Sequence, residues 1–262
     1  MRHLKSWLLV LCGLALLNTT ALAYHTGKNN PKRPAPTKPE LRYLEDCNNA
    51  VAQIDQAINN VRARLTTGGD VWWNSTDGRY VVPKVAPGLP EVSSIFAGAV
   101  WLGGVDPAGN LKLAAQTFGR ADRQFDFFPG PLNASGKTDK ETCARWDRFF
   151  VVKGESIREH LRNWNAAVNA GKTYNPDQIP RDIKGWPASG NEFFEEIHGF
   201  SLPSTRQGLA GFWDQDGDGN YNPELGDFPV IEIRGCLDKP QFPDEMIFWI
   251  YNDAGNIHAE SQ

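Results

Sequence analysis

Apolar residues in the first quarter of the chain recur every three or four positions, which is the spacing of one face of an α-helix. The stripe consists of Leu44, Cys47, Val51, Ile54, Ile58, Val61 and Leu65. Gly68 and Gly69 follow it, and glycine commonly ends a helix. The pattern predicts an amphipathic helix from about Leu41 to Leu65 that packs on the domain's own sheet. A coiled-coil partner is the alternative, although three heptads are a marginal length for one.

After Gly69 the pattern changes to short apolar runs separated by turn-forming residues, which is typical of antiparallel strands. Two turn sequences lie between such runs: 74–78 between 71–73 and 80–82, and 106–110 between 95–102 and 111–118. Both turn sequences contain Asp, Asn and Gly, whose backbones readily adopt turn conformations. Each arrangement therefore predicts a β-hairpin.

Two further apolar runs, residues 149–152 and 246–251, have the length of strands. Between them, Ser156 is placed to cap a helix that runs to about Ala170 and ends before Gly171. We therefore predict an α+β fold that is predominantly antiparallel β-sheet and sandwich-like. It would carry the N-terminal amphipathic helix and this second short helix.

The N-terminus has the three parts of a secretory signal peptide. A basic start is followed by the apolar run Trp7–Leu17 and by Ala21-Leu22-Ala23, the small-x-small pattern of a cleavage site. As a helix the run would span about 16 Å, against about 30 Å for a bilayer core. We expect a signal peptide at 1–23, with a lipid anchor at Cys12 as the alternative. A disordered leader rich in Pro, Lys and Asn would follow at 24–40.

The remainder, 41–262, is long enough for a single β-rich domain, which we expect to continue beyond Gln262. Removing Arg2 and Lys5 with the signal would change the formal net charge from −4 to −6. A mildly acidic chain has no basic surplus to neutralise phosphates, so we expect no nucleic-acid partner. No later segment has 18 uninterrupted apolar residues, so we expect no membrane span.

Three cysteines lie after the expected cleavage site: Cys47, Cys143 and Cys236. In an oxidising compartment two of them would form a disulfide, and all three pairings are open. The third would then have its partner beyond Gln262.

The most specific chemical motif is the acidic stretch that begins at Asp214. Asp214, Asp216 and Asp218 occupy positions 1, 3 and 5 of a calcium-loop pattern, and Gly219 is the glycine of its sixth position. Calcium takes six to eight oxygen ligands, so alternate carboxylates on a tight loop suit it. The alternative is an Asp- and Gly-rich turn that remains solvated.

The pattern departs from an EF-hand at its end. The twelfth position is Leu225 rather than glutamate, and Pro223 prevents a regular exiting helix. We expect Asn220 to contribute its backbone carbonyl. Glu224 and Asp227 would close the coordination shell from a loop that bends back. The predicted cofactor is Ca²⁺ in a structural role.

No signature of an enzyme stands out. The chain lacks zinc-ligand spacings, a nucleophile elbow, a phosphate loop and a dinucleotide fingerprint. Trp72, Trp73 and Trp186 could stack against sugars, which suggests a carbohydrate-binding module attached to a downstream secreted enzyme as an alternative function. In a strand-rich domain most tryptophans belong to the core instead. An enzyme completed by residues beyond Gln262 is a further alternative.

Several longer strings resemble a known group of proteins. They are 61–65, 68–73, 94–104, 114–117, 126–132, 146–148, 213–229 and 251–253. This set is similar to the N-terminal region of large secreted proteins of gliding-type Gram-negative bacteria, which carry a C-terminal type IX secretion sorting domain. The resemblance covers residues 60–258, whereas the sequence contains no sorting domain.

The resemblance implies export by the type IX secretion machinery, cell-surface or extracellular residence, and a role in adhesion or in a surface structure. It carries over no catalytic residue, and Asp214, Asp216 and Asp218 match the family's Asp-x-Asp-Gly-Asp-Gly stretch. The sequence therefore predicts a non-enzymatic, calcium-stabilised extracellular domain. Its expected partners are the secretion machinery and extracellular glycans or surface proteins.

Overall fold

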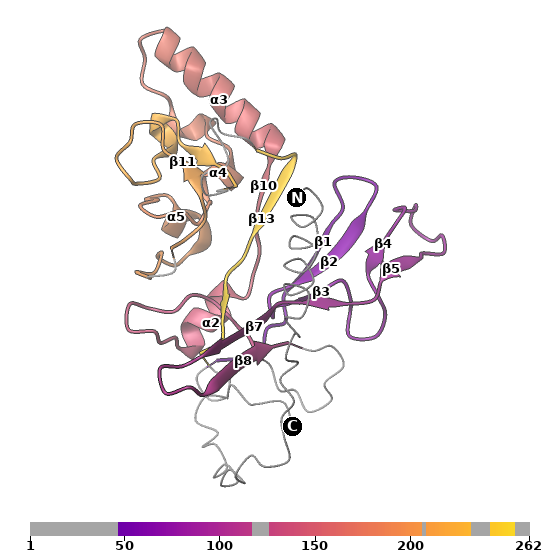
Figure 1. Ribbon diagram of the computed structural model, residues 1–262. Coiled ribbons are helices and arrows are strands. Elements are labelled where there is room, and N and C mark those ends of the chain that lie inside the picture. The colour runs from indigo at the N-terminus through magenta and orange to yellow at the C-terminus, as the bar shows by residue number, and fades with distance from the viewer. Residues whose placement is uncertain (1–46, 117–125, 206–207, 232–241, 255–262) are drawn as a thin grey trace, which may run out of the picture. The chain divides into compact units, whose positions relative to one another are not determined.

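The computed structural model describes residues 47–116, 126–205, 208–231 and 242–254, all of them within one unit, residues 40–262. The predicted signal peptide and leader, Cys236 and the first residues of the predicted N-terminal helix lie outside these ranges. The described part is an α+β fold with antiparallel strand pairing, as predicted (Figure 1). Within it, no helix is both long and apolar enough to cross a bilayer.

The largest sheet has six strands. They are β1 (Gln53–Gln56), β2 (Arg62–Thr66), β3 (Asp70–Val71), β4 (Tyr80–Val81), β5 (Ser93–Ile95) and β6 (Gly98–Ala99). The order is β5-β4-β2-β3-β6, with β1 on the other edge of β2. All pairs are antiparallel.

The helix predicted to extend to Leu65 is wrong over the described residues, because β1 and β2 form an antiparallel pair there. Asp55 lies directly opposite Arg64, and the two form an ion pair across the strands. Ile54 lies opposite Leu65, so the apolar positions also fit the two-residue period of a strand. The turn between the strands contains Asn59, whose Oδ1 accepts the Val61 amide at 2.8 Å. This Asn turn interrupts the apparent helical stripe.

The predicted hairpin around 74–78 is present only as a turn. A bridge pairs Trp73 with Gly78, but the flanking strands β3 and β4 both pair with β2 instead of with each other. The Arg79 amide donates to the Trp72 carbonyl, which joins the two ends of the turn segment. Residues 70–72 and 79–81 therefore lie one after the other along the same edge of β2.

The predicted hairpin around 106–110 is confirmed. Strands β7 (Trp101–Val105) and β8 (Leu111–Ala115) pair in full register and lie side by side (Figure 1). Asp106 Oδ1 accepts the amides of Ala108 and Asn110, at 3.0 and 2.8 Å, which stabilises the turn.

The rest of the described chain alternates short helices with paired strands. The helices are α2 (Lys140–Trp146), α3 (Gly154–Asn169), η2 (Pro176–Gln178), α4 (Arg181–Lys184), α5 (Phe194–His198) and η3 (Pro223–Leu225). The strand pairs are β9 (Phe128–Pro129) with β14 (Tyr251–Asn252), β10 (Phe150–Lys153) with β13 (Glu245–Phe248), and β11 (Phe212–Trp213) with β12 (Phe228–Pro229). The strands are thus divided among one sheet and several two-stranded pairs, a more fragmented arrangement than the predicted sandwich.

The strand at 149–152 and the helix after it are confirmed with shifted bounds, but Ser156 is not the N-cap. Helix α3 starts at Gly154, and Lys153 occupies the cap position without a side-chain hydrogen bond. Gly154 is close to the backbone of Pro243 and Asp244, and a Cβ there would collide with it. The segment just before β13 therefore lies directly against the first residue of the helix, where only glycine leaves enough space.

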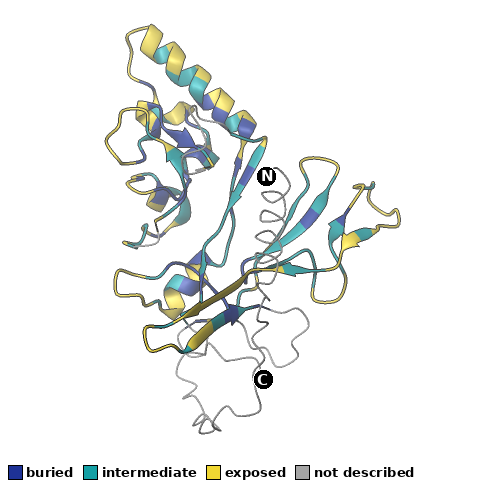
Figure 2. Ribbon diagram, viewed as in Figure 1, coloured by how far each residue is buried: buried dark blue, intermediate teal, exposed yellow. Residues whose placement is uncertain are grey.

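The main hydrophobic core is aromatic. Its buried members are Trp146, Phe150, Val152, Ile157, Tyr174, Ile179, Ile183, Trp186, Ala188, Phe194, Phe200, Ala210, Tyr221, Phe228 and Met246. Helices α2 to α5 and strands β10, β12 and β13 supply eight of these fifteen residues, and connecting segments supply the other seven. Buried residues are dark blue in Figure 2. A smaller cluster joins Phe128 to the disulfide-bonded pair Cys47 and Cys143.

Candidate metal centre

The acidic loop, residues 214–222, connects β11 to η3. Strand β11 pairs with β12, placing Phe212 opposite Pro229 and Trp213 opposite Phe228. This pairing returns the chain after the loop to the strand that precedes it. The loop is therefore closed at its base by a β-ladder.

Within the loop, the aspartates organise the backbone. Asp214 accepts the amides of Gly217 and Gly219 at 2.7 and 2.8 Å. Both glycines have positive φ, 79° and 83°, a conformation that other residues adopt at a cost. The bond from the Gly219 amide is the largest cause that holds the pKa of Asp214 below its usual value. The loop is thus built around an ionised carboxylate.

Asp216 and Asp218 make shorter-range turns. Asp216 Oδ1 accepts the Asp218 amide at 3.3 Å, and Asp218 Oδ1 accepts the Asn220 amide at 2.7 Å. The second oxygen of Asp218 accepts from the side chain of Asn222 at 2.9 Å. A carboxylate has about four lone-pair sites, so these bonds leave acceptor capacity on each group.

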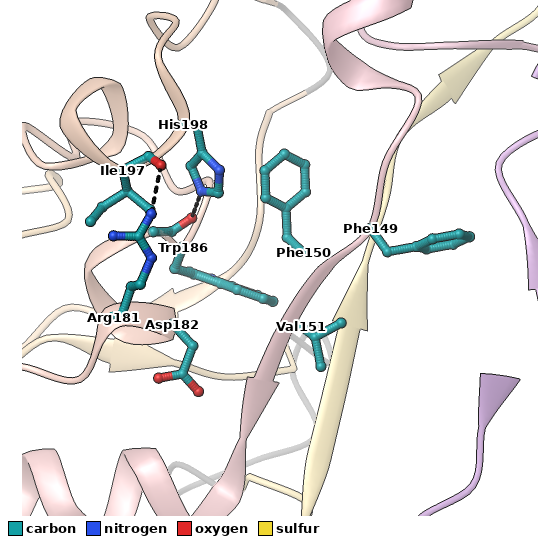
Figure 3. Close-up of a pocket in the computed structure, with 9 residues that line it drawn as sticks. Phe149, Phe150, Val151, Arg181, Asp182, Trp186, Ile197 and His198 are labelled. Carbon is teal, nitrogen blue, oxygen red and sulfur yellow. Dashed lines mark hydrogen bonds between the residues drawn. The ribbon is translucent and has the colours of Figure 1, made fainter. Parts of the chain in front are cut away.

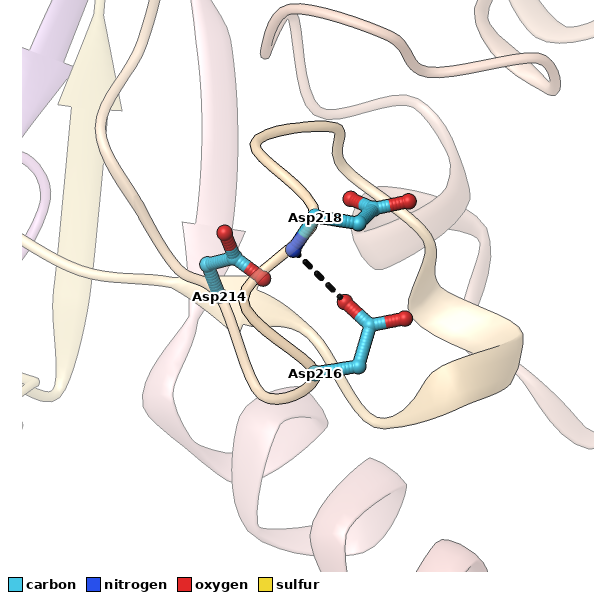
Figure 4. Close-up of side chains that lie close together, drawn as sticks. All are labelled: Asp214, Asp216 and Asp218. Atoms are coloured by element: carbon cyan, nitrogen blue, oxygen red, sulfur yellow. Dashed lines mark hydrogen bonds between the residues drawn. The ribbon is translucent and has the colours of Figure 1, made fainter.

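The structure brings Asp214, Asp216 and Asp218 together, as predicted (Figure 4). One oxygen from each lies within 4.8 Å of the others. Asp214 is partly buried and the other two are exposed. An oxygen-only donor set of this kind suits a hard cation such as Ca²⁺ or Mg²⁺.

Glu224 and Asp227 do not belong to this gathered group. Glu224 is exposed on η3. Asp227 is fully buried, and its two oxygens accept the amides of Gln215 and Asn222 at 2.8 and 2.7 Å. Asp227 therefore joins the two ends of the loop, a role that its position in the sequence did not suggest.

The environment of Asp227 is unfavourable for its charge. Burial raises its pKa to about 6, although the two amide hydrogen bonds act in the opposite direction. The charges of Asp214 and Asp216 raise the pKa further. A cation bound between those aspartates would lower the pKa of Asp227 through the same interactions.

Two buried side chains anchor the loop to the main core. The Tyr221 hydroxyl donates to the Ile183 carbonyl at 3.0 Å, and its amide donates to Ser189 at 2.8 Å. His160 of α3 donates from Nε2 to the Asp227 carbonyl at 3.0 Å. Burial lowers the pKa of His160 to about 4, so the ring is neutral at physiological pH. Neither role was predicted, because each depends on a partner far away in the chain, Ile183 for Tyr221 and Asp227 for His160.

Asn220 lies against the 186–191 segment. Gly190 has a φ of 85°, and a Cβ there would collide with the Asn220 side chain. The acidic loop is therefore packed closely on one side, whereas Asp216 and Asp218 face solvent on the other.

The predicted sugar-stacking platform is wrong at Trp186. This side chain is only 3% exposed, and its Nε1 donates to the Gly211 carbonyl at 3.0 Å. Trp72 packs edge-on against Tyr80 and approaches Gly98, while Trp73 donates from its indole to Asp70. Both are half-buried and lie directly after β3, rather than forming an open platform.

Of the three candidate disulfide pairings, the structure contains Cys47–Cys143. Their Cα atoms are 5.6 Å apart, and the bond links residues separated by 96 positions. Cys236 lies outside the described residues.

No protein-family model, curated protein or solved structure matches this chain.

Proposed function

We propose that this chain is a non-enzymatic extracellular domain, stabilised by a calcium ion that Asp214, Asp216 and Asp218 bind. The observation that carries the proposal is the gathering of their oxygens within 4.8 Å on a loop whose ends are tied to a buried core. A loop held in this way loses little conformational entropy when it binds an ion.

Electrostatics favours an ion at this position. Three carboxylates so close together repel one another, and the buried Asp227 behind them adds a fourth negative charge. A divalent cation would convert that repulsion into attraction. Extracellular calcium modules bind with Kd values of roughly 10⁻⁴ to 10⁻³ M, so three protein carboxylates completed by carbonyls and water are sufficient there.

The extracellular assignment has two independent supports. The N-terminal basic, apolar and small-x-small pattern is that of a secretory signal, and disulfides such as Cys47–Cys143 persist in oxidising compartments. Export by type IX secretion and adhesion to glycans or surface proteins follow from the family resemblance of the sequence strings, and we propose them on that basis.

Calcium titration of the metal-stripped protein tests the site. Saturating calcium at about 100 times Kd adds about 2.7 kcal/mol to the free energy of unfolding. For a domain of this size that raises Tm by about 5 to 10 °C. The Asp214→Asn and Asp218→Asn double variant should abolish the rise, because it removes two ligand charges while preserving side-chain shape.

The matched control is Asp177→Asn, which removes an exposed carboxylate on η2, outside the loop. It should retain the full calcium response. Glu224→Gln separates a three-carboxylate site from one that Glu224 completes, because only in the second case does calcium affinity fall. Equal Tm values with chelator and with millimolar calcium would refute the metal site.

A further inference from the structure

A pocket that shares no lining residue with the acidic loop is a second candidate site. It has a volume of about 380 Å³ and is formed by β10 with the residue before it, by α4 with the two residues after it, and by the end of α5 (Figure 3). Ligand pockets commonly measure roughly 300 to 1,000 Å³. This pocket is at the small end of that range, so it suits a molecule with a single ring rather than a polymer.

Most of the pocket wall is apolar. Phe149, Phe150 and Val151 line it from the strand side, and Trp186 and Ile197 from the helix side. Phe150 and Trp186 are almost fully buried and belong to the main core, so the wall is rigid. Phe149 is held by an edge-on contact with Trp249, at a ring separation of 5.4 Å. A ligand with a flat or branched apolar body would replace water against this wall.

Arg181 supplies a positive charge at the edge of the pocket (Figure 3). Its Nη2 donates to the Ile197 carbonyl at 3.1 Å, which orients the guanidinium and uses one of its five N–H groups. No carboxylate within the described residues forms an ion pair with it, whereas Arg62, Arg64, Arg79, Arg145 and Arg158 each have an acidic partner. The guanidinium fork is therefore oriented and available, and it matches the geometry of a carboxylate.

The nearby His198 reports the sign of the local potential. Its Nε2 donates to the Gly185 carbonyl at 2.8 Å, so Nε2 carries a proton. Burial lowers the pKa of the ring, and the positive charges of Arg148 and Arg181 lower it further. Arg148 lies over the Phe200 ring at 5.0 Å and is itself partly desolvated. Two arginines thus contribute positive potential on this side of the pocket.

Asp182 is the acidic residue among the lining side chains. Its carboxylate accepts the Lys153 amide at 3.1 Å and the Ile183 amide at 3.2 Å. Because neighbours on a helix point about 100° apart, Asp182 and Arg181 diverge, as Figure 3 shows. Asp182 therefore serves the backbone where β10 meets α4, and it leaves the Arg181 side of the pocket positive.

We propose that this pocket binds a small organic carboxylate with an apolar body of single-ring size. Arg181 receives the carboxylate, and the apolar lining, in which Val151 and Ile197 are partly exposed, receives the apolar body. The pocket shares no lining residue with the acidic loop, so failure of this proposal would leave the calcium proposal unaffected, and the reverse also holds.

Benzoate and benzyl alcohol are suitable probes, because they share the ring and differ in charge. The readout is the Trp186 indole N–H signal in ¹H–¹⁵N spectra of the full chain, assigned by its loss in the Trp186→Phe variant. Millimolar benzoate should shift this signal in a saturable manner. Benzyl alcohol should bind about tenfold more weakly or worse, since a hydrogen-bonded charge contributes at least one factor of ten.

The variant test is Arg181→Gln, which removes the charge and can retain one donor to Ile197. It should weaken benzoate binding about tenfold and leave benzyl alcohol unchanged. Arg158→Gln, an exposed arginine on α3, is the matched control and should change neither. Equal binding of the two probes by the unaltered chain would overturn the proposal, as would full benzoate affinity in Arg181→Gln. The first comparison does not use Arg181→Gln and therefore decides the question even if that variant does not fold.

Discussion

Two regions of the molecule are stabilised in different ways. The sheet region, residues 47–116, buries few apolar side chains, and those are small: Ala63, Val81 and Ala114 in addition to Cys47. The core region, residues 140–230 together with β13, buries a continuous aromatic cluster. Large exposed apolar residues concentrate in the sheet region, most of all along β7 and β8, where Trp101 is 67% exposed (Figure 2).

The difference shows what holds a sheet that has little core of its own. Its β-ladders are supplemented by ion pairs such as Arg64 with Asp55, and by ties to α2. Asp147, directly after α2, accepts the amides of Val51 and Ala52 at 3.0 and 3.1 Å and the hydroxyl of Thr67. With the Cys47–Cys143 bond, these contacts fasten the start of the sheet region to the core region. The sheet region therefore depends on long-range attachment more than on its own packing.

Removing a core aromatic should have the largest effect. Phe194→Ala deletes a fully buried ring that contacts Trp146, Phe150 and Phe200, and it should lower the free energy of unfolding by about 3 to 5 kcal/mol. Leu102→Ala, in the exposed hairpin, should change it by less than about 0.5 kcal/mol. Urea unfolding measures both values. Comparable losses in the two variants would contradict the proposed contrast between the regions.

Removing the disulfide should destabilise the molecule somewhat less, and unevenly. Replacing Cys47 and Cys143 with alanine frees a loop closed over 96 positions and should cost about 2 to 4 kcal/mol. Amide hydrogen exchange should accelerate in β1 and β2 more than in α3, because the tie serves the sheet region. A uniform acceleration in both regions would show that they open as one unit.

The free energy of unfolding should depend on pH through two groups in the core region that act in opposite directions. The pKa of His160 is about 4 in the folded chain and 6.5 in the unfolded chain. Its contribution to the free energy of unfolding is therefore lost as pH falls from 6.5 to 4. Near the lower end of this pH range, the loss lowers the free energy of unfolding by about 3 kcal/mol. Asp227 has a pKa of about 6 when folded and 3.8 otherwise, so its contribution is lost as pH rises through that window. With a chelator present, the rise of the free energy of unfolding with pH due to His160 should largely cancel the fall due to Asp227 between pH 4 and 6.

Single variants should reveal each slope. His160→Gln should leave stability that falls with rising pH across this range, whereas Asp227→Asn should leave stability that rises. Urea midpoints at several pH values provide the measurement. Two variants with the same slope would show that these groups do not govern acid stability.

Local patterns predicted some elements well. The hairpin β7–β8 was predictable from its turn, in which Asp106 accepts amides two and four positions away. Helix α3 was predictable from the helical stretch between β10 and Gly171. The start of α2 also had an overlooked local signal, since Asp139 accepts the Thr142 amide at 2.7 Å as an N-cap. For β1 and β2 the apolar spacing fitted both a helix and a strand. The Asn turn between them was the local signal that favoured the strand pair.

By itself, the sequence determined the conformation of the acidic loop, because Asp214 and its two glycines interact within five positions and need no distant partner. Tertiary structure alone decided that Asp227 is buried, that His160 supports it from α3, and that Trp186 is buried. It also assembled the pocket beside Arg181 from three separate elements. These features depend on contacts between residues far apart in the chain. Burial and hydrogen bonding of that kind exist only once the segments have packed together.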